Sequence, residues 1–138
     1  MSALNTRLFF VWLLCAATAT LAPFDFGPLS TSSAQGFTAY SDGSHQQDPT
    51  HIVLNMLLFV PLGALVYHKG QRSGLNLLSL VFVAGTTALL ISFGVESLQR
   101  FLPSREPSLV DILANTAGAL VGVLAGRLWR TAGMEFQG

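Results

Sequence analysis

Charged residues are scarce in this sequence, and those present balance one another. Only 10% of the 138 residues are Asp, Glu, Lys or Arg, whereas a soluble domain has about 25%. Seven basic and seven acidic residues give a formal net charge of 0, so no basic field is present to attract nucleic acid. Cys15 is the single cysteine, which excludes an internal disulfide framework and a cysteine-rich zinc site.

What the sequence has instead is apolar side chains. They make up 51% of the residues, and a soluble protein with so few charges would precipitate. This hydrophobicity also excludes a disordered chain. The composition therefore indicates an integral membrane protein, and the length indicates a single domain over residues 1–138.

Four apolar stretches predict an all-α fold, an integral membrane bundle of four transmembrane helices. A helix needs about 20 residues to cross the hydrocarbon core of a bilayer. When the polar ends of the stretches are included, the spans are expected near residues 5–23, 49–68, 75–97 and 108–129.

The first span has a second interpretation. It is short, and it also resembles a signal peptide with a small-residue cleavage site at Ala17–Ala19. The sequence does not decide whether this span is retained.

The positive charges predict the orientation. Lys69 and Arg72 lie between the second and third spans, and Arg127 and Arg130 follow the core of the fourth. The loop at residues 24–48 contains no Lys or Arg. Because positive residues remain in the cytoplasm, both termini are expected inside and this loop outside.

Small residues recur at every fourth position of the last span: Ala114, Gly118, Gly122 and Gly126. Such a small-xxx-small row allows another helix backbone to approach closely. The second or third span is expected to pack there. A homo-oligomer formed through Gly118, Gly122 and Gly126 is the alternative.

Polar residues within the spans gather at the outer end of the predicted bundle. Ionisable groups in a membrane are costly and normally face the bundle interior, so these residues mark a candidate site. In each span their spacing of three or four places them on one helix face. The expected outer layer consists of Asp48, His51, Asn55, Glu96, Gln99, Arg100, Arg105, Asp111 and Asn115.

The run VESLQRFLPSREPSLVDILANTAGALVG, with NMLLFVPLG upstream, resembles the VanZ-like membrane family. The resemblance covers roughly Asp48–Gly126 and implies a multi-pass protein of the bacterial cytoplasmic membrane. The family's named member is associated with low-level teicoplanin resistance, so a link to glycopeptide resistance is implied. The residues that match are Asn55, Phe59, Pro61, Gly63, Glu96, Gln99, Pro103, Arg105, Asp111, Asn115 and Gly118.

Ligand recognition is the working hypothesis for the outer layer, because arginine binds phosphate and carboxylate groups in a bidentate manner. The expected ligand is an anionic or amphiphilic lipid, a lipid-linked wall precursor or a lipophilic glycopeptide. The residues expected to bind it are Asn55, Glu96, Gln99, Arg100, Arg105, Asp111 and Asn115.

Two other interpretations remain open. The charged residues of the layer could form an ion-pair clasp that fixes the helix ends. Alternatively, Glu96 and Asp111 could serve as general acid and base of a membrane hydrolase, with His51 as a proton shuttle. No serine or cysteine nucleophile motif accompanies them, so an enzyme is the less favoured interpretation of the sequence.

A metal site is the weakest alternative. His45, Asp48 and His51 have a His-x2-Asp-x2-His spacing that is not an established zinc signature, although Glu96 and Asp111 could add ligands. No metal and no cofactor are therefore expected, and membrane lipids are the expected partners.

Overall fold

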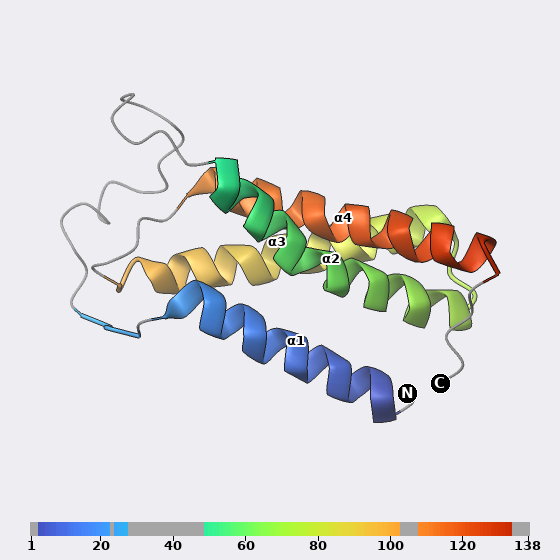
Figure 1. Cartoon of the computed structure of the whole chain (residues 1–138), viewed down its shortest axis with the longest axis horizontal. Coiled ribbons are helices and arrows are strands. Elements are labelled where there is room, and N and C mark those ends of the chain that lie inside the picture. The colour runs from blue at the N-terminus through green and yellow to red at the C-terminus, as the bar shows by residue number, and fades with distance from the viewer. Residues whose placement is uncertain (1–2, 23, 28–48, 103–107, 134–138) are drawn as a thin grey trace.

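The computed structural model describes residues 3–22, 24–27, 49–102 and 108–133, and its helices run along one long axis (Figure 1). Within these ranges the chain is helical and has no β-strand, so the predicted all-α class is confirmed. The helices are α1 (Ala3–Leu21), α2 (Pro49–Arg72), α3 (Leu77–Gln99) and α4 (Leu109–Thr131).

Three of these helices, α2, α3 and α4, are long and apolar enough to cross a membrane. They coincide with the three later predicted spans, although α2 extends four residues beyond the predicted end at residue 68. The apolar stretch of α1, Thr6–Leu21, is shorter. A fourth membrane crossing, like the orientation of the bundle, therefore stays a prediction.

Local sequence signals set the helix ends. The Asn76 side chain accepts a hydrogen bond from the Ser79 N–H at 2.9 Å and caps α3. Gly74, in the turn between α2 and α3, has a φ of 75°, a left-handed conformation that glycine adopts without a Cβ clash. The helix α2 begins at Pro49, because proline has no N–H and is favoured at the first position of a helix. The preceding residue, Asp48, lies outside the described residues.

The backbones of α2 and α4 lie in direct contact. A Cβ atom at Gly118 would overlap the carbonyl oxygen of Met56, and one at Gly122 would overlap that of Val60. On the other side of the contact, Gly63 of α2 meets the α4 backbone in the same way. Glycine hydrogens fill these positions instead, an arrangement in which Cα–H···O contacts form. The prediction of close packing by the small-residue row is confirmed, and its partner is α2.

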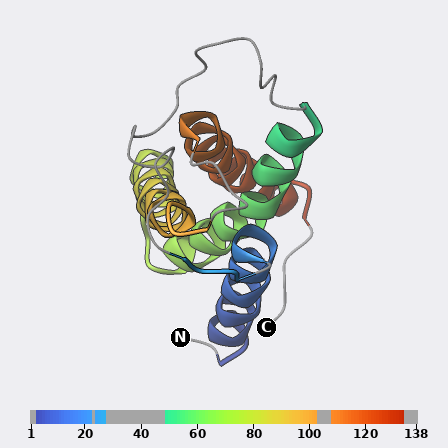
Figure 2. The same ribbon diagram turned by 90° about the vertical axis from the view of Figure 1, so that its left-hand side faces the viewer.

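The homo-oligomer expected through the same glycines stays a prediction. In the bundle their face is covered by α2, which lies between α4 and α1 in the end view (Figure 2). An oligomer that used these glycines would first have to separate α2 from α4.

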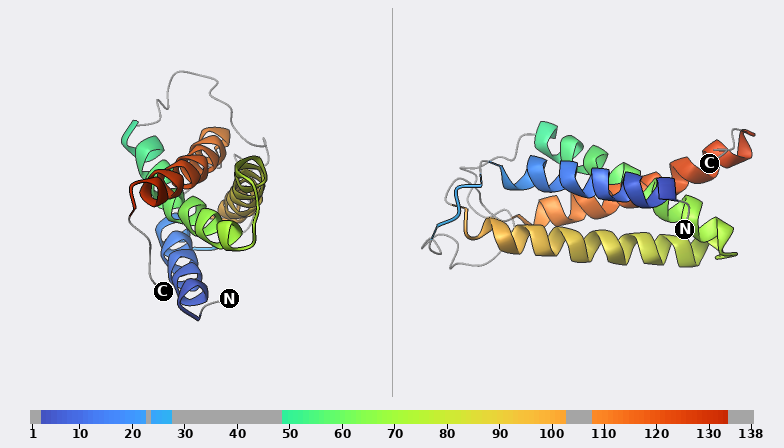
Figure 3. Two further views of the ribbon diagram at one scale, coloured as in Figure 1. Left: turned by 90° about the vertical axis from the view of Figure 1, so that its right-hand side faces the viewer. Right: turned by 90° about the horizontal axis from the view of Figure 1, so that it is seen from below.

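The first helix lies against α2 and α3 (Figure 3), and its Trp12 and Ala16 belong to one buried apolar cluster with residues of the other helices, Phe59, Leu62, Ala88 and Ala119. Trp12 is buried, and its ring makes a T-shaped contact with Phe59 at 5.5 Å between centroids. Its Nε1 also donates a 2.7 Å hydrogen bond to the carbonyl oxygen of Leu58. Pro61 has no N–H to donate to the Leu57 carbonyl, four residues earlier, and Trp12 donates to the next carbonyl of that turn, that of Leu58.

Candidate functional site

Glu96 connects the end of α3 to the beginning of α4. Its side chain is 2% exposed, and its Oε2 accepts a 2.8 Å hydrogen bond from the backbone N–H of Ser108. Ser108 is the N-cap of α4, and its Oγ accepts from the Val110 N–H at 3.2 Å. The first N–H groups of a helix lack intrahelical acceptors and carry partial positive charge, so a carboxylate is stabilised there.

Gln99 makes the corresponding contact with α1. Its Nε2 donates a 2.9 Å hydrogen bond to the carbonyl oxygen of Thr20, in the last turn of that helix. The last carbonyls of a helix have no intrahelical donor. Since Glu96 and Gln99 are three residues apart on one face, α3 satisfies backbone groups at the ends of both α4 and α1.

Asn115 has a carboxamide with one polar atom that lacks a partner. The side chain is 2% exposed, and its Nδ2 donates to the Oγ of Ser92 at 2.8 Å. Its Oδ1 is buried and accepts no hydrogen bond within the described part of the chain. The Ser92 hydroxyl can donate as well as accept, so rotation of the amide would offer the NH₂ group instead. An unpaired buried polar atom costs about 1–3 kcal/mol, which a ligand or water group would recover.

The other predicted site residues surround this junction to different degrees. Asp111 is half-buried in the first turn of α4, and Arg100 is half-buried as the C-cap of α3. Asn55 is half-buried on α2, whereas His51 is exposed near its beginning. His45, Asp48 and Arg105 lie outside the described residues.

No arrangement suited to a metal ion is present among the described side chains. Across residues 3–22, 24–27, 49–102 and 108–133, no three His, Cys, Asp or Glu side chains are grouped as ligands. Two of the three residues in the predicted His-x2-Asp-x2-His pattern fall outside these ranges.

The structure adds Thr20, Ser92 and Ser108 to the candidate site, which sequence reasoning misses. Hydroxyl residues in membrane helices usually bond their own backbone, as Thr116 does with the Ile112 carbonyl at 2.8 Å. Their residue type therefore does not distinguish a hydroxyl residue that bonds another helix from one that bonds only its own. The available signal for Ser92 is its position four residues before Glu96, on the same face of α3.

The sequence of this chain matches one known protein family over most of its length. Residues 8–130 match the model of the VanZ/LLP1 family. The chain belongs to the VanZ/LLP1 family. The match confirms the resemblance drawn from the motif residues and extends it to most of α1. Comparisons with curated proteins and with solved structures found no match. Together with its three membrane-length helices, the match identifies a VanZ-like membrane protein.

Proposed function

We propose that this protein binds the head group of an anionic or amphiphilic lipid at the outer end of its bundle, in the bacterial cytoplasmic membrane. The observation that carries the proposal is the Asn115 carboxamide, which Ser92 holds while its other end lacks a partner within the described ranges. An amide can donate to a phosphate or accept from a hydroxyl or amine, and lipid head groups contain these groups.

The proposal gives Glu96 and Gln99 a positioning role. Their side chains bond to backbone groups of α4 and α1, so their role is to orient these helices. The guanidinium groups supply the charge for an anionic head group, because they form paired hydrogen bonds with phosphate. The ligand contacts are then expected from Asn55, Arg100, Arg105, Asp111 and Asn115.

Such a site gives the proposed link to glycopeptide resistance a physical route. A lipid-linked wall precursor and a lipophilic glycopeptide both present polar groups beside an apolar chain at the membrane surface. Each would therefore compete with a phospholipid for the same outer site. Resistance would follow from a change in how much precursor or antibiotic is accessible there.

A double substitution separates binding from folding. In Ser92→Ala/Asn115→Leu both polar partners are removed together, so no buried group is left unpaired and the cost to stability is small. We expect this variant to melt near the parent in detergent but to retain less lipid than the parent, because it lacks the outer site. The measurement is mass spectrometry of the lipids that remain with the purified protein.

The matched control is Thr116→Val, one residue along α4. The Thr116 hydroxyl bonds within its own helix, so this variant should keep the same lipids as the parent. If Ser92→Ala/Asn115→Leu also keeps them, or if the parent carries no lipid, the binding proposal is wrong.

A purely structural layer is the second candidate, and the backbone bonds of Glu96 and Gln99 favour it. It predicts identical lipid retention in all three proteins. The hydrolase alternative stays a prediction with its own signature. Glu96→Gln would then abolish turnover of a lipid substrate while leaving lipid retention unchanged.

A further inference from the structure

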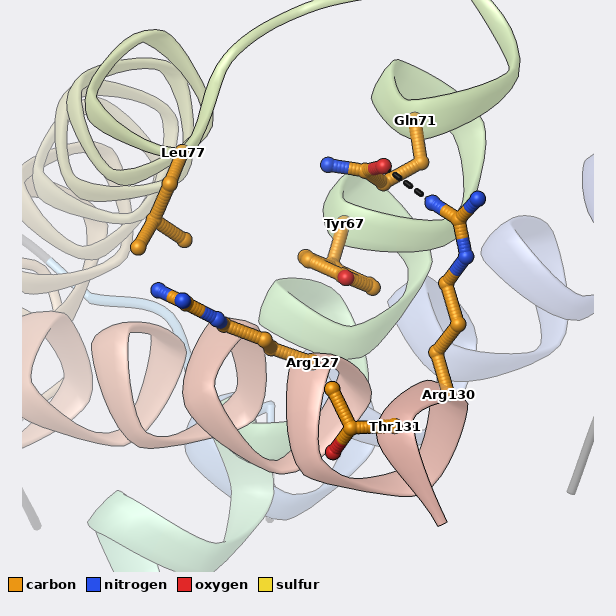
Figure 4. A pocket seen from close by; sticks show the side chains of 6 residues that line it. All are labelled: Tyr67, Gln71, Leu77, Arg127, Arg130 and Thr131. Atoms are coloured by element: carbon orange, nitrogen blue, oxygen red, sulfur yellow. Dashed lines mark hydrogen bonds between the residues drawn. The ribbon is translucent and has the colours of Figure 1, made fainter. Parts of the chain in front are cut away.

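A basic pocket lies at the end of the bundle opposite the outer polar layer (Figure 4). It forms where α2 and α4 end and α3 begins, and its volume is about 430 Å³. Two of its lining side chains are arginines and none is acidic. The lining residues are Tyr67, Gln71, Leu77, Arg127, Arg130 and Thr131.

The described charges at this end all have one sign. Lys69 and Arg72 lie in the last turn of α2, and Arg127 and Arg130 lie near the end of α4. The acidic residues of the described ranges belong to the other end, after α1, late in α3 and early in α4. They are Asp25, Glu96 and Asp111.

Gln71 fixes one of the two arginines. Its Oε1 accepts a hydrogen bond from Nη1 of Arg130, and its Nε2 donates to the Leu75 carbonyl oxygen at 3.5 Å. The side chain thus joins α4, α2 and the turn that leads to α3. One N–H group of the Arg130 guanidinium is used, and its other N–H groups remain donors for a ligand.

Tyr67 and Arg127 bring unused polar groups to the pocket. Tyr67 is 6% exposed, yet its hydroxyl makes no hydrogen bond within the described ranges. Arg127 makes neither an ion pair nor a hydrogen bond with any described residue. Figure 4 shows the Tyr67 ring between Arg127 and the Gln71–Arg130 pair. A phenolic hydroxyl that lines a pocket can donate a hydrogen bond to an acceptor placed there.

We infer that this pocket binds the phosphate group of an anionic phospholipid in the cytoplasmic leaflet. Phosphate oxygens match guanidinium forks and a phenolic donor, and basic pockets at the cytoplasmic side of helix bundles suit anionic head groups. The positive-inside rule places this end in the cytoplasm. Beside Arg127 on α4, the exposed side chains of Leu124 and Leu128 offer an apolar surface to the acyl chains.

Lipid binding in this pocket differs from the non-specific electrostatic attraction between surface cations and anionic lipids. Arginine side chains near the ends of membrane helices extend toward the membrane interface, where they contact lipid phosphates without a defined site. In this pocket Arg130 is held in place by Gln71, and the Tyr67 hydroxyl is fixed by the burial of its ring. The arrangement therefore depends on particular side chains and not on charge alone.

The experiment uses the full chain in detergent, titrated with phosphatidylglycerol and followed by native mass spectrometry. Phosphatidylcholine, which has no net charge, serves as the comparison lipid. We expect Arg127→Gln to weaken phosphatidylglycerol binding about tenfold, the value for loss of one charge-assisted hydrogen bond. Tyr67→Phe removes one hydroxyl and should weaken it less. Lys69→Gln removes the same charge at the same end but outside the pocket lining, and should leave binding unchanged.

Several results would overturn the inference. These are equal binding of the two lipids by the parent, or equal losses for Arg127→Gln and Lys69→Gln. Inorganic phosphate separates the two sources of the ligand, because displacement of phosphatidylglycerol by phosphate alone would assign the pocket to a soluble anion. Should Arg127→Gln not fold, Tyr67→Phe carries the test.

The proposals for the basic pocket and for the outer site can be tested independently of each other. Ser92→Ala/Asn115→Leu lies at the other end of the bundle and should leave the Arg127-dependent lipid bound. Loss of that lipid in the double variant would contradict the independence of the two sites.

Discussion

The Oε2 atom of Glu96 and the backbone N–H of Ser108 are joined by a 2.8 Å hydrogen bond that crosses from α3 to the N-cap of α4. In a capping box this bond is made by a residue three positions after the N-cap, within the same helix. Asp111 occupies that position in α4, but the bond comes from Glu96 of the preceding helix. Of the two VanZ-like motif acids, it is therefore Glu96 and not Asp111 that accepts the hydrogen bond of the N-cap N–H of α4.

The first prediction concerns this bond. Glu96→Ala should lower the free energy of unfolding by about 1–3 kcal/mol, because it leaves the Ser108 N–H buried without an acceptor. Glu96→Gln should cost less, since its amide oxygen can accept the same bond. Denaturant unfolding in detergent micelles measures both variants. Ser97→Ala is the control, because that hydroxyl donates within α3 to the Phe93 carbonyl at 2.7 Å. Equal losses for the Gln and Ala variants would show that the charge of Glu96 matters, as an ion-pair clasp requires.

The second prediction concerns the attachment of α1. Gln99→Leu should destabilise the fold by about 1 kcal/mol and speed amide exchange in the last turn of α1, because Thr20 loses its donor. Trp12→Phe keeps an aromatic ring but removes the bond to the Leu58 carbonyl, with a cost of similar size. Hydrogen exchange read by mass spectrometry locates each effect. Leu98→Ala, at an exposed neighbour on α3, should leave the exchange of α1 as in the parent. If amide exchange in the last turn of α1 were the same in Gln99→Leu as in the parent, Gln99 would not stabilise the end of that helix.

The third prediction concerns the contact of α2 with α4. Gly122→Ala should cost about 1–3 kcal/mol, because its methyl group meets backbone atoms that cannot move aside. Gly94→Ala is the matched control, since an added Cβ there meets nothing within 4 Å. Thermal unfolding of the two variants compares them directly. Equal melting temperatures would mean that the helices do not approach as closely as described.

The fourth prediction concerns orientation. In a Cys15→Ala background, Ser73→Cys should react with an impermeant thiol reagent only after cells are opened, because basic residues flank the exposed turn around it. Thr50→Cys, exposed near the beginning of α2, should react in intact cells. The reverse labelling pattern would show that the bundle has the opposite orientation, with the basic pocket on the outer side of the membrane.

Much of the fold could be predicted from the sequence, because hydropathy fixes which segments cross a membrane and small-residue spacing fixes which face packs closely. The choice of α2 as the partner of α4 could not be predicted. It depends on where the carbonyl oxygens of Met56 and Val60 meet the glycines, and side-chain patterns do not encode that.

The candidate site was predictable in part for a similar reason. Glu96 and Gln99 attract notice because polar groups are costly in a span. Their partners are backbone groups of Ser108 and Thr20, and a backbone group is the same at every position, so it leaves no signal in the sequence. The unpaired amide end of Asn115 likewise appears only when the burial of neighbouring atoms is known.

The bond between Gln99 and Thr20 has a consequence for how the protein is made. The two residues are 79 positions apart in the chain, and Trp12 and Leu58 are 46 apart. The ribosome delivers α1 first, but the donor for its last turn does not exist until α3 has been synthesised. The helix that is first to emerge is therefore not fully held until the third helix is complete. A chain interrupted between α2 and α3 would leave α1 bonded through Trp12 but without a donor for the Thr20 carbonyl.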